Sequence, residues 1–128
     1  MGTSLIDSNI VIDYLNRKIP IKGLQFVGQR IKRGAALSAI SKIELLSPSM
    51  PADDENIVRQ FIGSVQVLPI TEEVIDHAIA IRKLTRIKVP DAIIASTAKL
   101  NRCALITRNV QDFKGVPDLE LLNPWTLY

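Results

Sequence analysis

The chain has 128 residues, 47% hydrophobic content and a net charge of +3, which suits one domain, residues 1–128, and permits a polyanionic partner without requiring one. Its single cysteine, Cys103, excludes an internal disulfide and a cysteine-based zinc cluster, and its single histidine, His77, lies beside no serine nucleophile motif. Without a signal-like N-terminus or an apolar run of about 18 residues, it is expected to be a soluble, cytoplasmic protein with no membrane partner.

The first half of the chain predicts two strand-to-helix units. A strand is expected at residues 2–7, followed by a helix that opens at Ser8 or Asn9 and ends before Pro20. A second helix is expected at 22–33, where Gly34 is a suitable stop. The second unit is a strand at 35–39 and a helix that ends before Pro48, with Ile40, Ile43 and Leu46 as its apolar stripe.

The second half continues the alternation of strands and helices. The expected elements are a helix in 51–64, a strand at 65–70, a helix from the cap Thr71 to Thr85, a buried helix that opens near Pro90, and strands at 104–107 and 119–122. Strands that alternate with helices predict a parallel sheet covered on both faces. The expected fold is therefore an α/β three-layer sandwich with a central, mainly parallel sheet flanked by helices.

Three acidic residues lie where a metal ligand would be useful, but each also has a structural explanation. Asp7 follows the first strand, and it either caps the next helix or binds a metal at the strand end. Glu44 lies beside the apolar stripe of its helix, where it either pairs with a cation or bends back to solvent. Asp91 opens the buried helix, where the helix dipole favours its charge and capping alone could explain it.

Asn109 and Asp112 follow the next-to-last predicted strand and are ordinary turn residues on their own. Their position makes them candidate site residues, because ligands of such sheets bind outside the carboxyl ends of the strands. Carboxylates gathered there repel one another, and oxygen ligands without His or Cys suit Mg²⁺ or Mn²⁺. We therefore expect Asp7, Glu44 and Asp91 to lie close enough to share a divalent cation, which makes phosphodiester hydrolysis the leading chemistry.

Four segments, in this order, resemble the motifs of the PIN-domain ribonucleases, and among these the VapC-like toxins of bacterial and archaeal toxin–antitoxin modules. The segments are LIDSNIVIDYL from Leu5, ALSAISKIELL from Ala36, VPDAIIASTAKL from Val89 and LITRNVQDFKGVPDLELLNP from Leu105. The resemblance covers almost the whole chain. It implies an endoribonuclease that depends on Mg²⁺ or Mn²⁺ and cleaves RNA, forms a homodimer, and is covered at its site by a cognate antitoxin protein.

The resemblance also implies roles for individual residues, with one position open. By its placement after Thr107 the family's fourth acidic position matches Asn109, whereas Asp112 is the nearest acid. Asp112 is preferred here because Mg²⁺ favours anionic oxygen. The implied catalytic and metal-binding residues are Asp7, Glu44, Asp91 and Asp112, and the implied substrate-binding residues are Ser8, Thr107, Arg108 and Asn109.

Two other functions fit parts of the pattern. A phosphatase that uses the acid after its first strand as a nucleophile generally needs a second acid two residues later, where this chain has Asn9. A non-catalytic RNA- or protein-binding module with the same fold is the main alternative. Purified protein separates it from a nuclease, because a binding module retains RNA without shortening it.

Overall fold

The computed structural model describes residues 3–126, so Gly2, at the start of the predicted first strand, lies outside the described residues. Its centre is a five-stranded sheet in which every pair of neighbours is parallel, in the order β3-β2-β1-β4-β5. This confirms the predicted three-layer α/β fold. The strands are β1 (Ser4–Ile6), β2 (Ala35–Ser38), β3 (Gln66–Leu68), β4 (Ala104–Ile106) and β5 (Leu121–Leu122).

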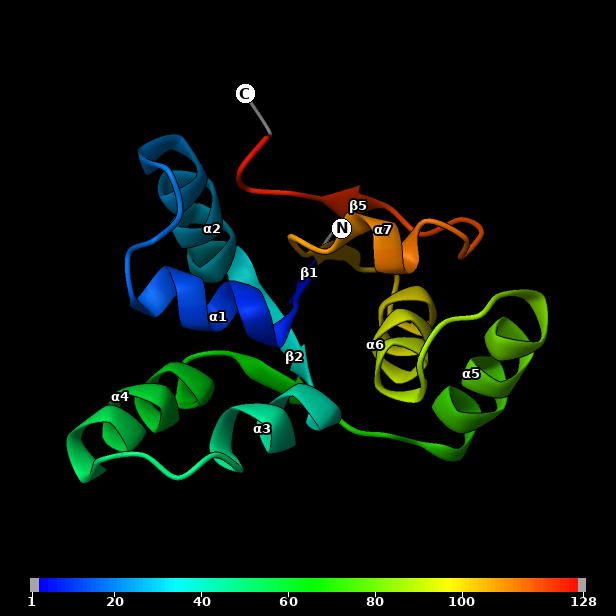
Figure 1. Ribbon diagram of the computed structural model, residues 1–128, viewed down its shortest axis with the longest axis horizontal. Coiled ribbons are helices and arrows are strands. Elements are labelled where there is room, and N and C mark those ends of the chain that lie inside the picture. Colours follow the sequence, from blue (N-terminus) through cyan, green and yellow to red (C-terminus); the bar gives the residue numbers. More distant parts are fainter. Residues whose placement is uncertain (1–2, 127–128) are drawn as a thin grey trace.

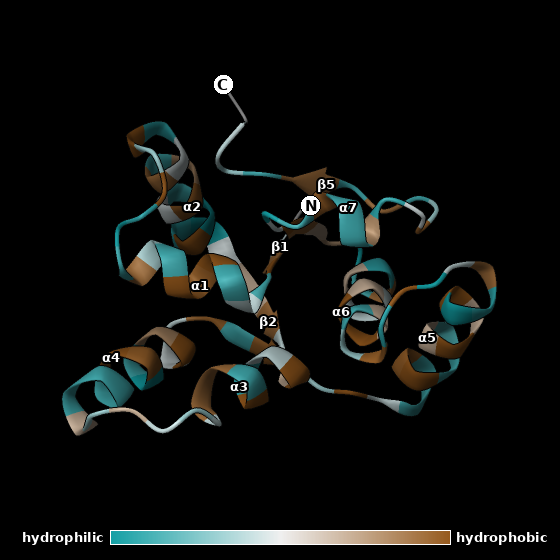
Figure 2. Cartoon of the chain, in the orientation of Figure 1, coloured by the Kyte–Doolittle hydropathy of each residue, from teal (hydrophilic) through white to brown (hydrophobic). Residues whose placement is uncertain are grey.

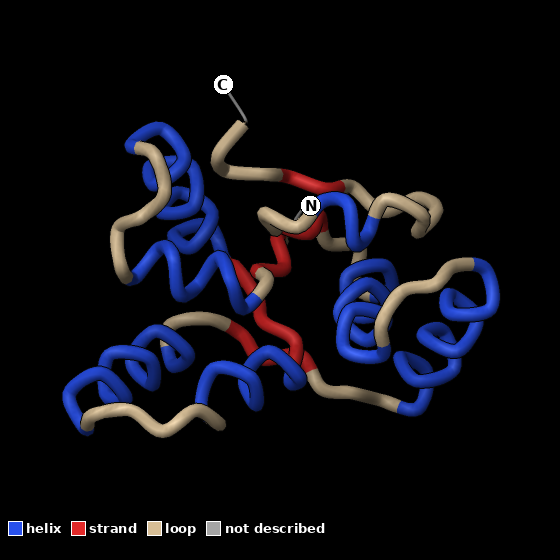
Figure 3. Tube along the Cα trace, viewed as in Figure 1, coloured by secondary structure: helices blue, strands red, loops and turns tan. Residues whose placement is uncertain are grey.

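Helices connect the strands and lie on both sides of the sheet (Figures 1 and 3). Within residues 3–126, none of them combines the length and the apolar character that crossing a membrane requires. They are α1 (Ser8–Leu15), α2 (Ile21–Gly34), α3 (Ala39–Leu46), α4 (Ala52–Gly63), α5 (Glu72–Leu84), α6 (Val89–Leu100) and the short α7 (Val110–Phe113).

The two faces of the sheet are covered by different helices, because neighbouring residues of a strand point in opposite directions. Leu5 and Leu105 pack with buried residues of α5 and α6. Ile6 and Ile106, one residue further along the same strands, pack with buried residues of α1, α2 and α4. The apolar colouring of the strands in Figure 2 agrees with this two-sided burial.

The strand order places a topological switch point between β1 and β4. From β1 the chain adds β2 and β3 on one side of the sheet, and it then returns to add β4 and β5 on the other side. Beyond the strand ends the ladder continues, since the N–H of Asp7 donates to the carbonyl of Ile106 at 3.0 Å and that of Thr107 donates to the carbonyl of Leu122 at 3.0 Å. The crevice outside such a switch point is where sheets of this kind bind ligands.

Two local predictions were wrong. The predicted apolar stripe of α3 is wrong at Ile43, which is 58% exposed, whereas Ile40 and Leu46 pack partly buried against the core; the buried residues of the helix are Ser41 and Leu45. Ile43 lies two positions from each of them, which is the opposite side of a helix. The segment read as a turn around Asn109 and Asp112 contains the short helix α7.

Candidate active site

Asp7 stands at the N-cap position of α1, but its side chain makes no capping hydrogen bond. The main-chain carbonyl of Asp7 accepts from the N–H of Ile10 at 3.0 Å, whereas its carboxylate accepts a hydrogen bond from the Thr107 hydroxyl at 2.8 Å. The residue is only 5% exposed. Helix capping of the usual kind therefore does not account for this acid, and its carboxylate is held by Thr107 at the end of β4.

Thr107 connects the ends of β1 and β4. It is 0% exposed, and its hydroxyl both donates to Asp7 and accepts from the N–H of Asn109 at 3.0 Å. One hydroxyl thus holds the buried carboxylate and the turn that leads into α7. The small hydroxyl residue at this position is a structural link between two predicted site residues.

Glu44 reaches the start of α1 from α3. Its carboxylate accepts a hydrogen bond of 3.1 Å from the hydroxyl of Ser8, the first residue of α1. Glu44 is solvent-exposed. The expectation that it lies beside a buried apolar stripe was therefore wrong, and the alternative that its side chain faces solvent is correct. The bond to Ser8 nevertheless directs it toward the carboxyl end of β1.

Asp91 is the third residue of α6, whose N-cap position is occupied by Lys88 without a side-chain capping bond. Asp91 is therefore not the N-cap residue, but it lies in the first turn, where the helix dipole favours its charge, as expected from the sequence. Partial burial, and next the charges of Asp7, Asp112 and Glu44, raise the pKa of Asp91 to about 6, while the charge of Lys88 acts in the opposite direction. A carboxylate with such a pKa is partly protonated near neutral pH.

The same influences act on Asp7. Burial raises its pKa, the hydrogen bonds from Thr107 and from the backbone of Ser8 lower it, and the charges of Glu44 and Asp112 raise it again. All four predicted acids are therefore near enough for their charges to interact. The structure brings them together from the end of β1 and from the helices α3, α6 and α7.

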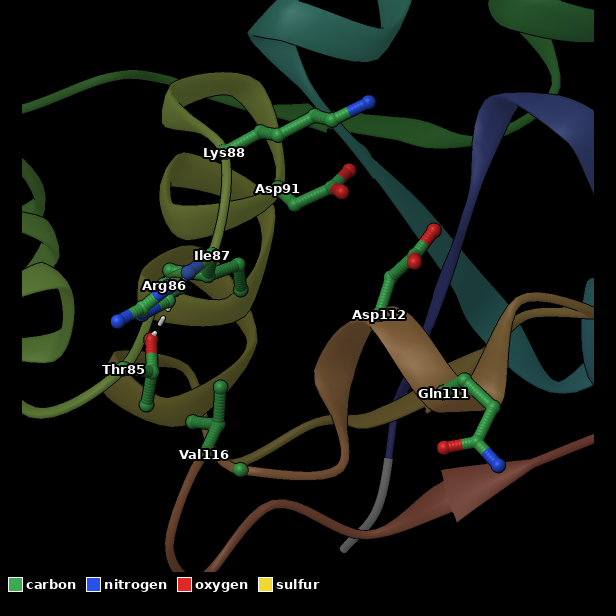
Figure 4. Close-up of a pocket in the computed structure, with 9 residues that line it drawn as sticks. Thr85, Arg86, Ile87, Lys88, Asp91, Gln111, Asp112 and Val116 are labelled. Atoms are coloured by element: carbon green, nitrogen blue, oxygen red, sulfur yellow. Dashed lines mark hydrogen bonds between the residues drawn. The ribbon is translucent and has the colours of Figure 1, made fainter.

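Asn109 and Asp112 differ in how their side chains are placed relative to the other acids. Asn109 is the N-cap of α7, makes no side-chain capping bond, and accepts the N–H of Asp112 at its main-chain carbonyl at 3.0 Å. Figure 4 shows the carboxylates of Asp91 and Asp112 directed into the same space. The charge of Asp112 also acts on Asp7 and Asp91. Of the two residues, Asp112 is the one with anionic oxygen directed toward the other acids.

The donor set suits a hard divalent cation. Its ligands would be carboxylate oxygens, and their mutual repulsion is relieved when a cation is bound. Within residues 3–126, however, no three or more Asp, Glu, His or Cys side chains are already arranged to hold a metal ion.

Arg108, the predicted cation of the site, is held by an aromatic ring. Its guanidinium carbon lies 4.1 Å from the centre of the Trp125 ring, in the range of a cation–π interaction. Trp125 follows β5 and packs, partly buried, against the core cluster that includes residues of α1 and α2. Sequence reasoning missed Trp125 and Lys88. The only signals were an aromatic residue near the C-terminus and a lysine three residues before Asp91.

Comparison with known proteins gives one family and several similar structures. The PIN domain family model matches residues 4–119. Similar structures include a toxin–antitoxin complex from Klebsiella pneumoniae, with 29% identity, TM-score 0.76, and coverage of 95% of this chain and 98% of that one. FitAcB from Neisseria gonorrhoeae has 25% identity, TM-score 0.80 and coverage of 98% and 100%.

A further structure shows similarity of fold alone. It is the DNA-bound VapBC of Salmonella typhimurium, with 21% identity, TM-score 0.81, and coverage of 97% of this chain and 99% of that one. No curated protein sequence matches the chain.

Proposed function

The chain belongs to the PIN domain family, and from this premise we propose that it is a metal-dependent endoribonuclease and the toxin of a toxin–antitoxin pair. The observation that carries the proposal is that the charges of Glu44 and Asp112 act on both Asp7 and Asp91, beside the switch point of the sheet. The Asp7 side chain makes no capping bond to α1, and Asp91 is not the N-cap residue of α6. A divalent cation would relieve the repulsion between these acids, and a cation beside acids is suited to phosphodiester hydrolysis.

In this proposal Asp7, Glu44, Asp91 and Asp112 would hold Mg²⁺ or Mn²⁺. The ion would supply an activated water and would neutralise charge on the phosphate. The chain's own contribution is to fix the ligands. Thr107 holds the Asp7 carboxylate through a 2.8 Å hydrogen bond, and Ser8 holds that of Glu44 through a 3.1 Å hydrogen bond. Because the pKa of Asp91 is raised to about 6, protons compete with the cation for this carboxylate.

RNA is the proposed substrate, and Ser8, Thr107, Arg108 and Asn109 are the proposed contacts beside the acids. Arg108 supports this role, because its guanidinium is exposed and is oriented by the Trp125 ring. Such a group binds a phosphate bidentately. We also propose that residues 1–128 form one nuclease domain and that the protein acts in the cytoplasm, where it would meet RNA.

The proposed protein partners are a cognate antitoxin and a second copy of the chain in a homodimer. The Klebsiella structure is itself a toxin–antitoxin complex. The exposed apolar side chains of Ile12, Ile43 and Ile57, which are 46%, 58% and 50% exposed, also support a protein partner on α1, α3 and α4.

Purified protein and an end-labelled single-stranded RNA test the proposal. We expect shortening of the RNA with Mg²⁺, none with EDTA, and none with Asp91→Asn. Asp118→Asn is a matched control, because this exposed acid precedes β5 and so lies at the amino ends of the strands, opposite the acids. Asn tolerates its φ of 59°. RNA that is bound but stays intact with wild type and Mg²⁺ would instead identify a non-catalytic binding module.

A further inference from the structure

A pocket of about 300 Å³ opens beside the proposed active site. One wall is the connection between α5 and α6, residues 85–88, and the other is α7 with the turn that follows it, including Gly115. Asp91 and Asp112 belong both to this pocket and to the acidic group. Whatever occupies the pocket therefore lies next to the acids of the proposed active site.

The first wall is held in place by hydrogen bonds. The guanidinium of Arg82 donates to the carbonyl of Ile87 at 3.1 Å, and the N–H of Ile87 donates to the Thr85 hydroxyl at 3.2 Å. The Thr85 hydroxyl in turn donates to the carbonyl of Ile81 at 3.2 Å. A wall fixed in this way binds a ligand without first having to become ordered.

Lys88 supplies positive charge at the mouth of the pocket. It is solvent-exposed, and Figure 4 shows its side chain extending on the same side as the carboxylates of Asp91 and Asp112. Arg86, which lines the same pocket, turns its side chain away from them. A phosphate that approaches the acids is repelled by them, so a cation on their side is the group that offsets this repulsion.

The size and lining of the pocket point to the class of ligand. A volume of about 300 Å³ is at the lower end for ligand pockets, and it suits one nucleotide unit better than a double helix. Ile87 and Val116 give the interior apolar surface for a base or sugar, while Lys88 stands at the charged mouth. Splayed bases of single-stranded RNA are accommodated in pockets of this kind.

We propose that this pocket binds one nucleotide of a single-stranded RNA next to the scissile phosphate, with Lys88 contacting the phosphate of that nucleotide. The inference rests on the proposed nuclease function, and it adds a binding site and a substrate-binding residue to it. Lys88 binds and positions the strand, while the acidic group carries out the hydrolysis.

The test measures binding of a fluorescent single-stranded RNA of about ten nucleotides by anisotropy at several salt concentrations. All proteins carry Asp7→Asn, which keeps the shape of that side chain, so that RNA is bound without being cut. Lys88→Gln should weaken binding roughly 10-fold, since a charge-assisted contact is lost. It should also reduce the slope of log K against log salt by about 0.7, the value for one phosphate contact on a single strand.

Two further variants separate the pocket from general basic charge. Gly115→Leu adds apolar volume inside the pocket, where an added Cβ would lie 3.4 Å from a methyl of Thr85, and this glycine does not need a positive φ. It should weaken binding with the salt slope unchanged. Arg86→Gln removes the same charge as Lys88→Gln from a side chain that points away, so it should change affinity less than about 2-fold. Thermal unfolding confirms that each variant is folded.

Equal losses in Lys88→Gln and Arg86→Gln, or RNA binding that neither Lys88→Gln nor Gly115→Leu weakens, would overturn the pocket assignment. The nuclease proposal would survive that result if the wild-type protein still cut RNA with Mg²⁺. An Asp7→Asn protein that binds no RNA, together with a wild-type protein that cuts none, would overturn both.

Discussion

The hydroxyl of Thr107 donates a 2.8 Å hydrogen bond to the carboxylate of Asp7, across a separation of 100 positions in the sequence. Both residues directly follow neighbouring parallel strands, β1 and β4. The contact therefore forms only when these strands pair in their native register. It ties the most buried acid of the proposed site to the same pairing that holds the centre of the sheet together.

Removing this hydroxyl should destabilise the protein. In Thr107→Val, the buried Asp7 carboxylate loses the Thr107 donor, and the N–H of Asn109 loses the acceptor of a part-buried hydrogen bond. We expect the free energy of unfolding at pH 7 to fall by about 2 kcal/mol, a typical value for a hydrogen bond to a charged group. Urea unfolding measures this change. Thr107→Ser should retain most of the stability, and equal losses in both variants would show that the methyl group matters instead.

The stability of the metal-free protein should depend on the protonation of Asp91. Its pKa is raised from 3.8 to about 6 by folding, so its stabilising contribution is fully present below about 3.8 and is lost as the pH rises through 6. Between pH 5 and 7 the melting temperature of the wild type should therefore fall relative to that of Asp91→Asn. Thermal unfolding in EDTA measures the difference. Parallel pH profiles of the two proteins would contradict the raised pKa.

The fourth acidic position should belong to Asp112. Its carboxylate faces Asp91, and its charge acts on both Asp7 and Asp91, whereas Asn109 is placed by main-chain bonds. We expect Asp112→Asn to reduce Mg²⁺-dependent cleavage clearly and Asn109→Ala to reduce it less, with both effects smaller than that of Asp91→Asn. All three are compared on one RNA at saturating metal. Unchanged cleavage in Asp112→Asn, together with lower stability, would return the position to Asn109.

The Trp125 ring should support RNA binding through Arg108. Trp125→Leu removes the surface on which the guanidinium rests, so Arg108 becomes more mobile, and RNA affinity should fall roughly 2- to 5-fold. Arg108→Gln should lower the affinity further. Phe26→Leu is the matched control, because Phe26 makes the same kind of contact: the guanidinium carbon of Arg30 lies 4.7 Å from the centre of its ring. Arg30 donates to Ser4 at the start of β1 and has no role in the proposed site. RNA affinity reduced as much by Phe26→Leu would point to a general loss of stability.

Much of the fold could be predicted because its signals are local. Thr71 caps α5, with its hydroxyl accepting the N–H of Val74 at 3.1 Å, and Gly34 ends α2 with a φ of 106°, as the sequence predicted. The phase of α3 could not be found in this way. An eight-residue helix with apolar residues on several sides fits more than one orientation, and packing against α1, α4 and α6 selects one.

The candidate site was predictable only in part for a similar reason. The positions of Asp7 and Asp91 after a strand and at a helix start follow from the alternation of elements, and they mark the carboxyl edge of the sheet. The roles of Lys88 and Trp125 depend on which segments meet in space. Lys88 lines a pocket together with residues of α7, and Trp125 contacts Arg108 in the turn after β4. In both cases the neighbour is distant in the sequence.

Calorimetric titration of Mn²⁺ at pH 6 tests the central claim most directly, namely that the four acids together hold a divalent cation. The wild type should bind Mn²⁺ and release protons, because Asp91, with its pKa raised to about 6, must lose its proton when the ion binds. Asp7→Asn and Asp91→Asn should each weaken binding roughly 10- to 100-fold, while Asp118→Asn should leave it unchanged. Affinity that is the same in all four proteins, without proton release, would contradict the account.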